Sequence, residues 1–240
     1  MKCNKDMILK LSWWKILTII LLIFSLLAGF LGSIPTMPTG NLYETARNLY
    51  FHVPMWFAMS FWLLASCGFA IMYLRTRNAK YNFLMTAATE VSMIFGALGL
   101  ITGAVWARFT WGAYWHGDPK QTGAAIAMLI YLAFFVLKSA MEDKERSATV
   151  AAIYNILAFF TYIPLIYVLP RLVDSMHPGN GGNPGFNVYD LAAQMRPIFY
   201  PSVIAWILMG GWITTLRKRM WEIEEKINQT SNTKTIEVIS

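Results

Sequence analysis

Charged residues are scarce in this sequence, and long apolar runs stand in their place. Only 14% of the 240 residues are Asp, Glu, Lys or Arg, and 56% are hydrophobic. An ordinary soluble domain carries about 25% charged residues. Several apolar runs approach about 20 residues, the length that crosses the hydrocarbon core of a bilayer. The composition therefore argues against a soluble globular domain and predicts an all-α, polytopic membrane protein.

Cysteine is equally rare, with only Cys3 and Cys67, and neither lies in a CxxC or CxxCH sequence. This absence excludes a disulfide framework, a zinc ribbon and the covalent heme attachment site of a c-type cytochrome. The formal net charge is +7. That charge does not indicate nucleic-acid binding, because its placement follows the pattern of membrane-protein loops.

Six transmembrane helices are predicted from the apolar runs. They are expected at residues 16–34, 53–74, 83–107, 121–137, 148–169 and 197–216. With the basic N-terminal segment they form one membrane domain, residues 1–228. Residues 229–240 are expected to be a polar, disordered tail.

The basic residues predict the orientation of these helices. Fifteen of the 20 Lys and Arg residues lie in the N-terminal segment, the second and fourth loops and the tail. Positive residues concentrate on the cytoplasmic side, so both termini are expected in the cytoplasm and loops one, three and five outside. The three histidines, His52, His116 and His177, all lie in or at the edge of outer loops.

The third loop, from Trp106 to Thr122 (WARFTWGAYWHGDPKQT), is unusually rich in aromatic residues. Isolated tryptophans often form belts at the membrane surface. Here the rings are concentrated, and Gly112 and Gly117 allow the backbone to approach a ligand closely. Large apolar ligands bind surfaces of this kind. We therefore expect a flat aromatic platform for a large, flat apolar ligand. Its residues are Trp106, Trp111, Gly112, Tyr114, Trp115, Asp118 and Pro119.

Asp118 and Pro119 also have a local structural role. Asp is a strong helix N-cap, and Pro is favoured at the first helical position. The pair is therefore expected to begin the fourth helix.

The histidines are candidate iron ligands, because neutral imidazole binds iron and heme takes axial ligands from the protein. His52 and His177 each lie beside a proline, in FHVP and MHPG, which restrains the local backbone. They also flank the aromatic loop from two other outer loops. We expect these two as axial ligands, with His116 as a weaker candidate.

The aromatic loop resembles the tryptophan-rich WWD signature of the CcmC/CcsA family of cytochrome c biogenesis proteins. The family pattern WGxYWxWDPKxT appears here as Trp111, Gly112, Tyr114, Trp115, Asp118, Pro119, Lys120 and Thr122. The resemblance covers most of the chain, including six spans, an HVP sequence and a His before the last span. The length resembles the short, six-span CcmC type. Gly117 departs from the pattern, since the family has a second Trp there.

This resemblance implies non-covalent heme b in transit at the outer face of the bacterial cytoplasmic (inner) membrane. The WWD loop would contact the porphyrin, and His52 and His177 would be the axial ligands. The implied partners are a membrane-anchored heme chaperone and ABC-type transporter subunits, besides the lipid bilayer. The protein would be a heme carrier in cytochrome c maturation and not an enzyme.

Other polar residues are weaker site candidates. Glu90 is an acidic residue within the third span, where ionisable groups often have a function. Arginines on the outer side suit heme propionates, because guanidinium pairs with carboxylates. These are Arg47, Arg108 and Arg171.

Three other functions remain open from the sequence. A CcsA-like synthetase component that attaches heme to apocytochrome would use the same loop and histidines, although no large extra outer domain is present. A membrane b-type cytochrome would favour histidines inside the spans. A cofactor-free permease or structural subunit explains the six spans but not the gathering of Trp and His outside.

Overall fold

The computed structural model describes residues 12–32, 34, 44–177 and 191–239, with side chains described through residue 228. All regular secondary structure in these ranges is helical. The long helices are α1 (Trp13–Leu31), α2 (Leu49–Thr76), α3 (Ala79–Trp111), α4 (Pro119–Ser139), α5 (Lys144–Ile163) and α7 (Arg196–Ile239). The short ones are η3 (Glu44–Asn48), η4 (Pro164–Val168), α6 (Leu169–Leu172) and η5 (Ala193–Met195).

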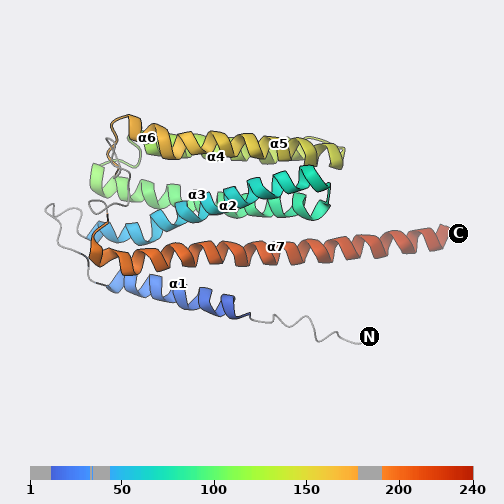
Figure 1. Ribbon diagram of the computed structural model, residues 1–240, viewed down its shortest axis with the longest axis horizontal. Helices are drawn as coiled ribbons and strands as arrows, with labels where there is room; N and C mark the ends of the chain where they lie inside the picture. The colour runs from blue at the N-terminus through green and yellow to red at the C-terminus, as the bar shows by residue number, and fades with distance from the viewer. Residues whose placement is uncertain (1–11, 33, 35–43, 178–190, 240) are drawn as a thin grey trace.

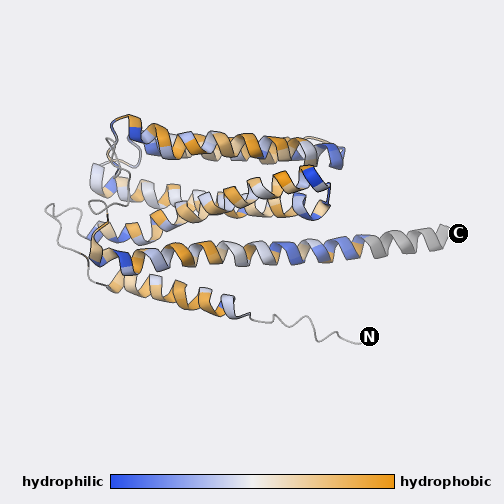
Figure 2. Ribbon diagram, in the orientation of Figure 1, coloured by the Kyte–Doolittle hydropathy of each residue, from blue (hydrophilic) through white to orange (hydrophobic). Residues whose placement is uncertain are grey.

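Six helical segments of the described chain are long and apolar enough to cross a membrane. The prediction of an all-α protein with six transmembrane helices is therefore confirmed. Hydrophobic residues predominate along the helices within the bundle (Figure 2). Residues such as Phe160 and Leu129, 67% and 64% exposed, face outward. Lipid is the solvent that such a surface requires.

The helices form a layered bundle with α2 and α3 in the middle (Figure 1). Helices α4 and α5 lie on one side, and α7 and α1 on the other. The largest buried cluster joins α2, α3, α4 and α5, with Met59, Leu63, Phe95 and Tyr131 fully buried. This core holds the ends of the central helices in fixed positions.

One end of the bundle collects the segments of interest. The start of α2, the end of α3, the start of α4 and α6 lie together there (Figure 1). We call it the histidine end, since His52 lies in the first turn of α2 and His177 follows α6. The opposite end holds the α2–α3 and α4–α5 turns and the projecting part of α7.

Three helices run further than the hydropathy predicts. Helix α3 continues past residue 107 to Trp111, so Trp106 and Trp111 lie on a helix and not in a loop. The helix ends where Gly112 adopts a left-handed conformation with φ of 92°. Helix α2 begins at Leu49, four residues before the expected start at 53, so His52 is helical. Helix α7 also extends to Ile239, through the range expected to be a tail.

Candidate functional site

His52 is held against α3 through one nitrogen of its ring. Its Nδ1 atom lies 3.1 Å from the hydroxyl oxygen of Thr102. That hydroxyl donates its own proton to the carbonyl oxygen of Leu98, 2.8 Å away, so it accepts from the imidazole. In the neutral ring, Nδ1 therefore carries the proton and Nε2 keeps its lone pair.

His177 is held in the same way by a charged partner. Its Nδ1 atom lies 2.7 Å from Oδ1 of Asp118, at the start of α4. A carboxylate only accepts, so Nδ1–H donates. Burial lowers the pKa of the His177 imidazole below its ordinary value, and the attraction of Asp118 offsets this only in part. The neutral ring with a free lone pair on Nε2 is therefore favoured.

Asp118 is itself fixed by several donors. Burial by itself raises the pKa of this carboxyl, but the surrounding donors and the imidazole together bring the pKa below its ordinary value. The side chain is 1% exposed. Its partners are the N–H groups of Lys120 and Met176, the Ser175 hydroxyl and His177. Asp118 caps α4, as predicted, with Pro119 in its first turn, and it also ties the segment after α6 to that helix.

Both imidazoles lie at the histidine end, close enough for a charge on His177 to act on His52. Among the described residues, each ring uses Nδ1 for its side-chain hydrogen bond, to Thr102 in His52 and to Asp118 in His177, and the His52 ring also interacts with the backbone of Gly99. No group of three or more His, Cys, Asp or Glu side chains able to hold a metal ion occurs in the part of the chain that the structure describes. What the described chain offers is two neutral nitrogen donors from segments far apart in the sequence.

Trp111 lies at the centre of the aromatic residues. Its ring packs edge-on against those of His177 and Trp106. The ring centroids are 4.8 Å apart for His177 and 5.1 Å apart for Trp106. The interplanar angles are 80° and 78°. These rings therefore form a corner and not the flat platform that we expected. The difference arises because Trp106 and Trp111 are five residues apart on a helix, which points them in different directions.

The other aromatic residues of the loop are more exposed than this corner. Tyr114 is 59% exposed and Trp115 49% exposed. His116 is also exposed, and its ring lies 6.1 Å from that of Trp111. Gly117 has φ of 70°, a conformation that a tryptophan rarely adopts. Glycine therefore suits the backbone conformation at the position where the WWD pattern has its second Trp.

Besides His116, the four other weaker candidates lie apart from the histidines or have structural partners. Glu90 forms a two-point ion pair with Arg217, with N–O distances of 2.8 Å and 3.0 Å. Arg47 donates to the carbonyls at the end of α1 and pairs with Glu44. Arg171 donates to a carbonyl within its own helical segment. Arg108 is exposed at the end of α3 and donates to the carbonyl of Gly112.

Sequence reasoning missed the residues that orient the histidines, namely Thr102, Gly103 and Ser175. A Cβ on Gly103 would lie 2.6 Å from Cε1 of His52, so only glycine leaves room for the ring. A signal was present, because Gly99, Thr102 and Gly103 are spaced three and four residues apart and share one face of a helix. Ser175 has no such signal.

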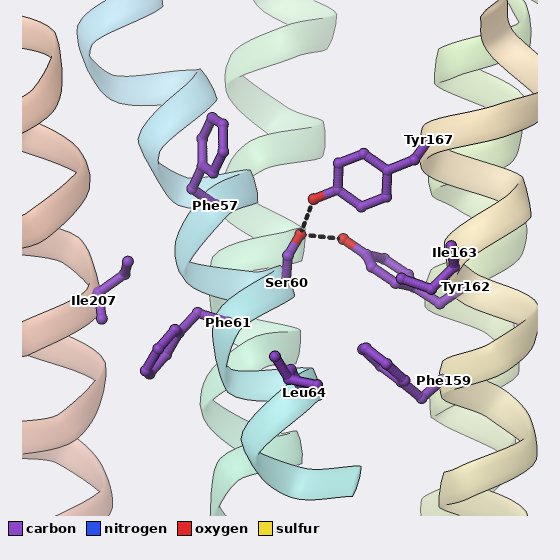
Figure 3. Close-up of a pocket in the computed structure, with 9 residues that line it drawn as sticks. All are labelled: Phe57, Ser60, Phe61, Leu64, Phe159, Tyr162, Ile163, Tyr167 and Ile207. Carbon is purple, nitrogen blue, oxygen red and sulfur yellow. Dashed lines mark hydrogen bonds between the residues drawn. The ribbon is translucent and has the colours of Figure 1, made fainter. Parts of the chain in front are cut away.

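A separate cavity of about 300 Å³ lies between α2, α5 and α7 (Figure 3). The Ser60 hydroxyl lies at its centre and bonds to the hydroxyls of Tyr162 and Tyr167, each at 2.6 Å. Ser60 is about two helical turns from His52 along α2. No histidine and none of the loop tryptophans lines this cavity. Its hydroxyl bonds tie α2 to the α5–η4 segment.

Comparison with known proteins gives one consistent result. Residues 4–234 match the family model of heme exporter protein C. The heme exporter protein C of Haemophilus influenzae is 24% identical over 216 residues, which cover 87% of this chain and 83% of that protein. That of Escherichia coli (strain K12) is 22% identical over 211 residues, which cover 87% and 82%.

A third relative, the heme exporter protein C of Bradyrhizobium diazoefficiens, is 31% identical over 123 residues. That match spans 51% of this chain and 46% of the relative, about half of each. The family model, in contrast, matches nearly the whole chain, and the resemblance seen in the WWD-type loop is confirmed. This protein belongs to the heme exporter protein C (CcmC) family.

Proposed function

We propose that this protein binds heme b non-covalently at the histidine end of its bundle and hands it on during cytochrome c maturation. The observation that carries the proposal is the pair of imidazoles, His52 and His177. Each ring uses Nδ1 for a side-chain hydrogen bond, so Nε2 is the nitrogen that would bind iron, and the two rings are within electrostatic reach. Imidazole is a common axial ligand of heme iron. The names of the related heme exporters support the same ligand.

The surroundings of the histidines fit a porphyrin. The corner formed by Trp106 and Trp111 supplies apolar surface beside His177. Tyr114 and Trp115, about half exposed or more, would cover a bound ring from the loop. Arg108 is exposed at the same end and suits a propionate, since guanidinium pairs with carboxylates. When bound, heme would supply the iron that these ligands hold.

The orientation follows from the basic residues. The positive-inside rule supports an assignment of the histidine end to the outer, periplasmic face of the inner membrane. We propose that heme passes from there to a membrane-anchored heme chaperone, with ABC-type transporter subunits as further partners. The protein acts as a carrier, because ligand exchange at iron transfers heme without any bond-making catalysis by the chain.

The experiment is an absorption spectrum of the full chain purified from heme-replete cells. The wild type should show a Soret band of low-spin, six-coordinate heme. His52→Ala and His177→Ala should each weaken that band strongly, because each removes one axial ligand. His116→Ala is the matched control and should keep the band, since its ring is exposed and edge-on to Trp111. Wild-type protein without heme would reject the proposed function.

A further inference from the structure

The two histidines differ in the charge of the group that holds Nδ1. Nδ1–H of His177 donates to the Asp118 carboxylate at 2.7 Å, and Nδ1–H of His52 donates to the Thr102 hydroxyl at 3.1 Å. A hydrogen bond to a charged acceptor is shorter and about twice as strong as one between neutral groups. The same ring nitrogen is therefore polarised strongly in one ligand and weakly in the other.

The difference is built into the fold. The Asp118 carboxylate accepts from two backbone N–H groups and a serine hydroxyl, and its side chain is 1% exposed. It is thus held in place as an anion. The Thr102 hydroxyl is neutral, and its O–H donates a hydrogen bond to a carbonyl of its own helix. His177 lies in a loop, but Asp118 fastens that loop to the start of α4.

A histidine that donates its second N–H to a carboxylate is a more basic ligand, so it binds a metal more strongly. Resting on the proposed function, we propose that His177 is the retained ligand of heme iron and His52 is the ligand released at handover. The Fe–N bond to His52 breaks, and its lone pair returns to Nε2. A neutral nitrogen or sulfur donor of the accepting protein supplies the lone pair of the new bond. No proton moves, and the oxidation state of iron does not change.

Carbon monoxide tests which histidine is released more easily, because it displaces one axial ligand from ferrous heme. Full-length, heme-loaded protein in nanodiscs is reduced, treated with CO and photolysed. Resonance Raman then records the Fe–His stretching band of the transient five-coordinate heme. The band should shift to lower frequency in Asp118→Asn and stay in place in Thr102→Val. Asp118→Asn should also weaken heme affinity by about 10–100-fold, as for other partners of metal-binding histidines.

Each outcome decides the question. A band that shifts with Thr102→Val, with both variants or with neither would overturn the inference. A wild-type spectrum without six-coordinate, low-spin heme before CO is added would reject the proposed function itself. The two failures are therefore distinguishable.

Asp118 also caps α4, so a second measurement avoids changing it. His52→Gly and His177→Gly are loaded with heme and free imidazole, which fills the missing ligand position. Their photolysed CO adducts are compared with that of the wild type. If the Fe–His stretching band of the wild type matches that of His52→Gly, the result supports retention of His177. If it matches that of His177→Gly, the result overturns the inference.

Discussion

At the histidine end, close contacts with neighbouring residues orient the two imidazoles. Gly103 lies under His52, and Thr102 bonds to the same ring. On the other side, Trp111 packs edge-on against His177. Each imidazole is thus fixed by hydrogen bonding and by packing contacts. Fixed orientation is what a metal ligand requires, because its lone pair must point at the metal.

Gly103→Ala should displace His52 and weaken heme binding. The added Cβ would lie 2.6 Å from Cε1 of the ring, so the imidazole must move away from Thr102. We expect a loss of about 10–100-fold in heme affinity, as for other changes around a metal-binding histidine. Gly68→Ala is the matched control, because a Cβ there meets nothing within 4 Å. Heme titration followed by the Soret band measures both; equal affinity in the two variants would contradict the placement of His52.

Elements of the bundle are joined by polar contacts remote from the histidines. Glu90 and Arg217 pair α3 with α7, and the Lys138 ammonium of α4 donates to Asn82 of α3. In the middle of the bundle, Asn155 of α5 donates to hydroxyls of α2 and α3. Glu90, expected as a possible functional carboxylate, is therefore part of helix packing. Such bonds matter in a membrane because packing between apolar helices has no hydrophobic driving force there.

Asn155→Ala should destabilise the bundle and leave heme binding intact. The change removes two interhelical bonds, each 3.1 Å long, to Ser66 and Thr89. Bonds of this kind contribute about 1 kcal/mol in membrane proteins. Thr161→Ala is the control in the same helix, because Thr161 is exposed and its hydroxyl bonds only to a carbonyl of that helix. Unfolding by SDS in bicelles measures the loss; a changed Soret band in Asn155→Ala would argue against a purely structural role.

The two ends of the molecule carry different structural features. The histidine end carries the aromatic corner, and the opposite end carries the projecting part of α7 (Figure 1). Helix α7 has 44 residues, about 66 Å at the usual rise, which is more than a bilayer core of about 30 Å accommodates. Hydrophilic residues predominate in the coloured section of α7 that leads out of the bundle (Figure 2). We expect this part in the cytoplasm, because its basic residues agree with the positive-inside rule.

Cysteine labelling tests this orientation. In a background without Cys3 and Cys67, Tyr114→Cys should react with a membrane-impermeant maleimide added to intact spheroplasts. Glu224→Cys should react only after the membrane is permeabilised. Both positions are exposed, so the difference reports the side of the membrane. Labelling in the reverse order would overturn the proposed orientation and the periplasmic site with it.

The helix ends show which boundaries can be predicted from neighbouring residues. Asp118 and Pro119 begin α4 as predicted, because capping depends on neighbouring residues alone. The end of α3 was predicted four residues too early, because the polar Arg108 and Thr110 lower the hydropathy without breaking the helix. Gly112 ends it instead. Hydropathy therefore locates a span, while backbone conformation decides where its helix stops.

The sequence by itself determined the class of this protein, its six spans and the gathering of histidines and tryptophans in adjacent segments. These properties depend on hydropathy, charge and capping, which neighbouring residues set. Only the tertiary structure decided which group orients each imidazole. Asp118 and His177 are 59 residues apart, and Thr102 and His52 are 50 apart. Contacts over such separations depend on how the helices pack, and packing brought a charged partner to one histidine and a neutral one to the other.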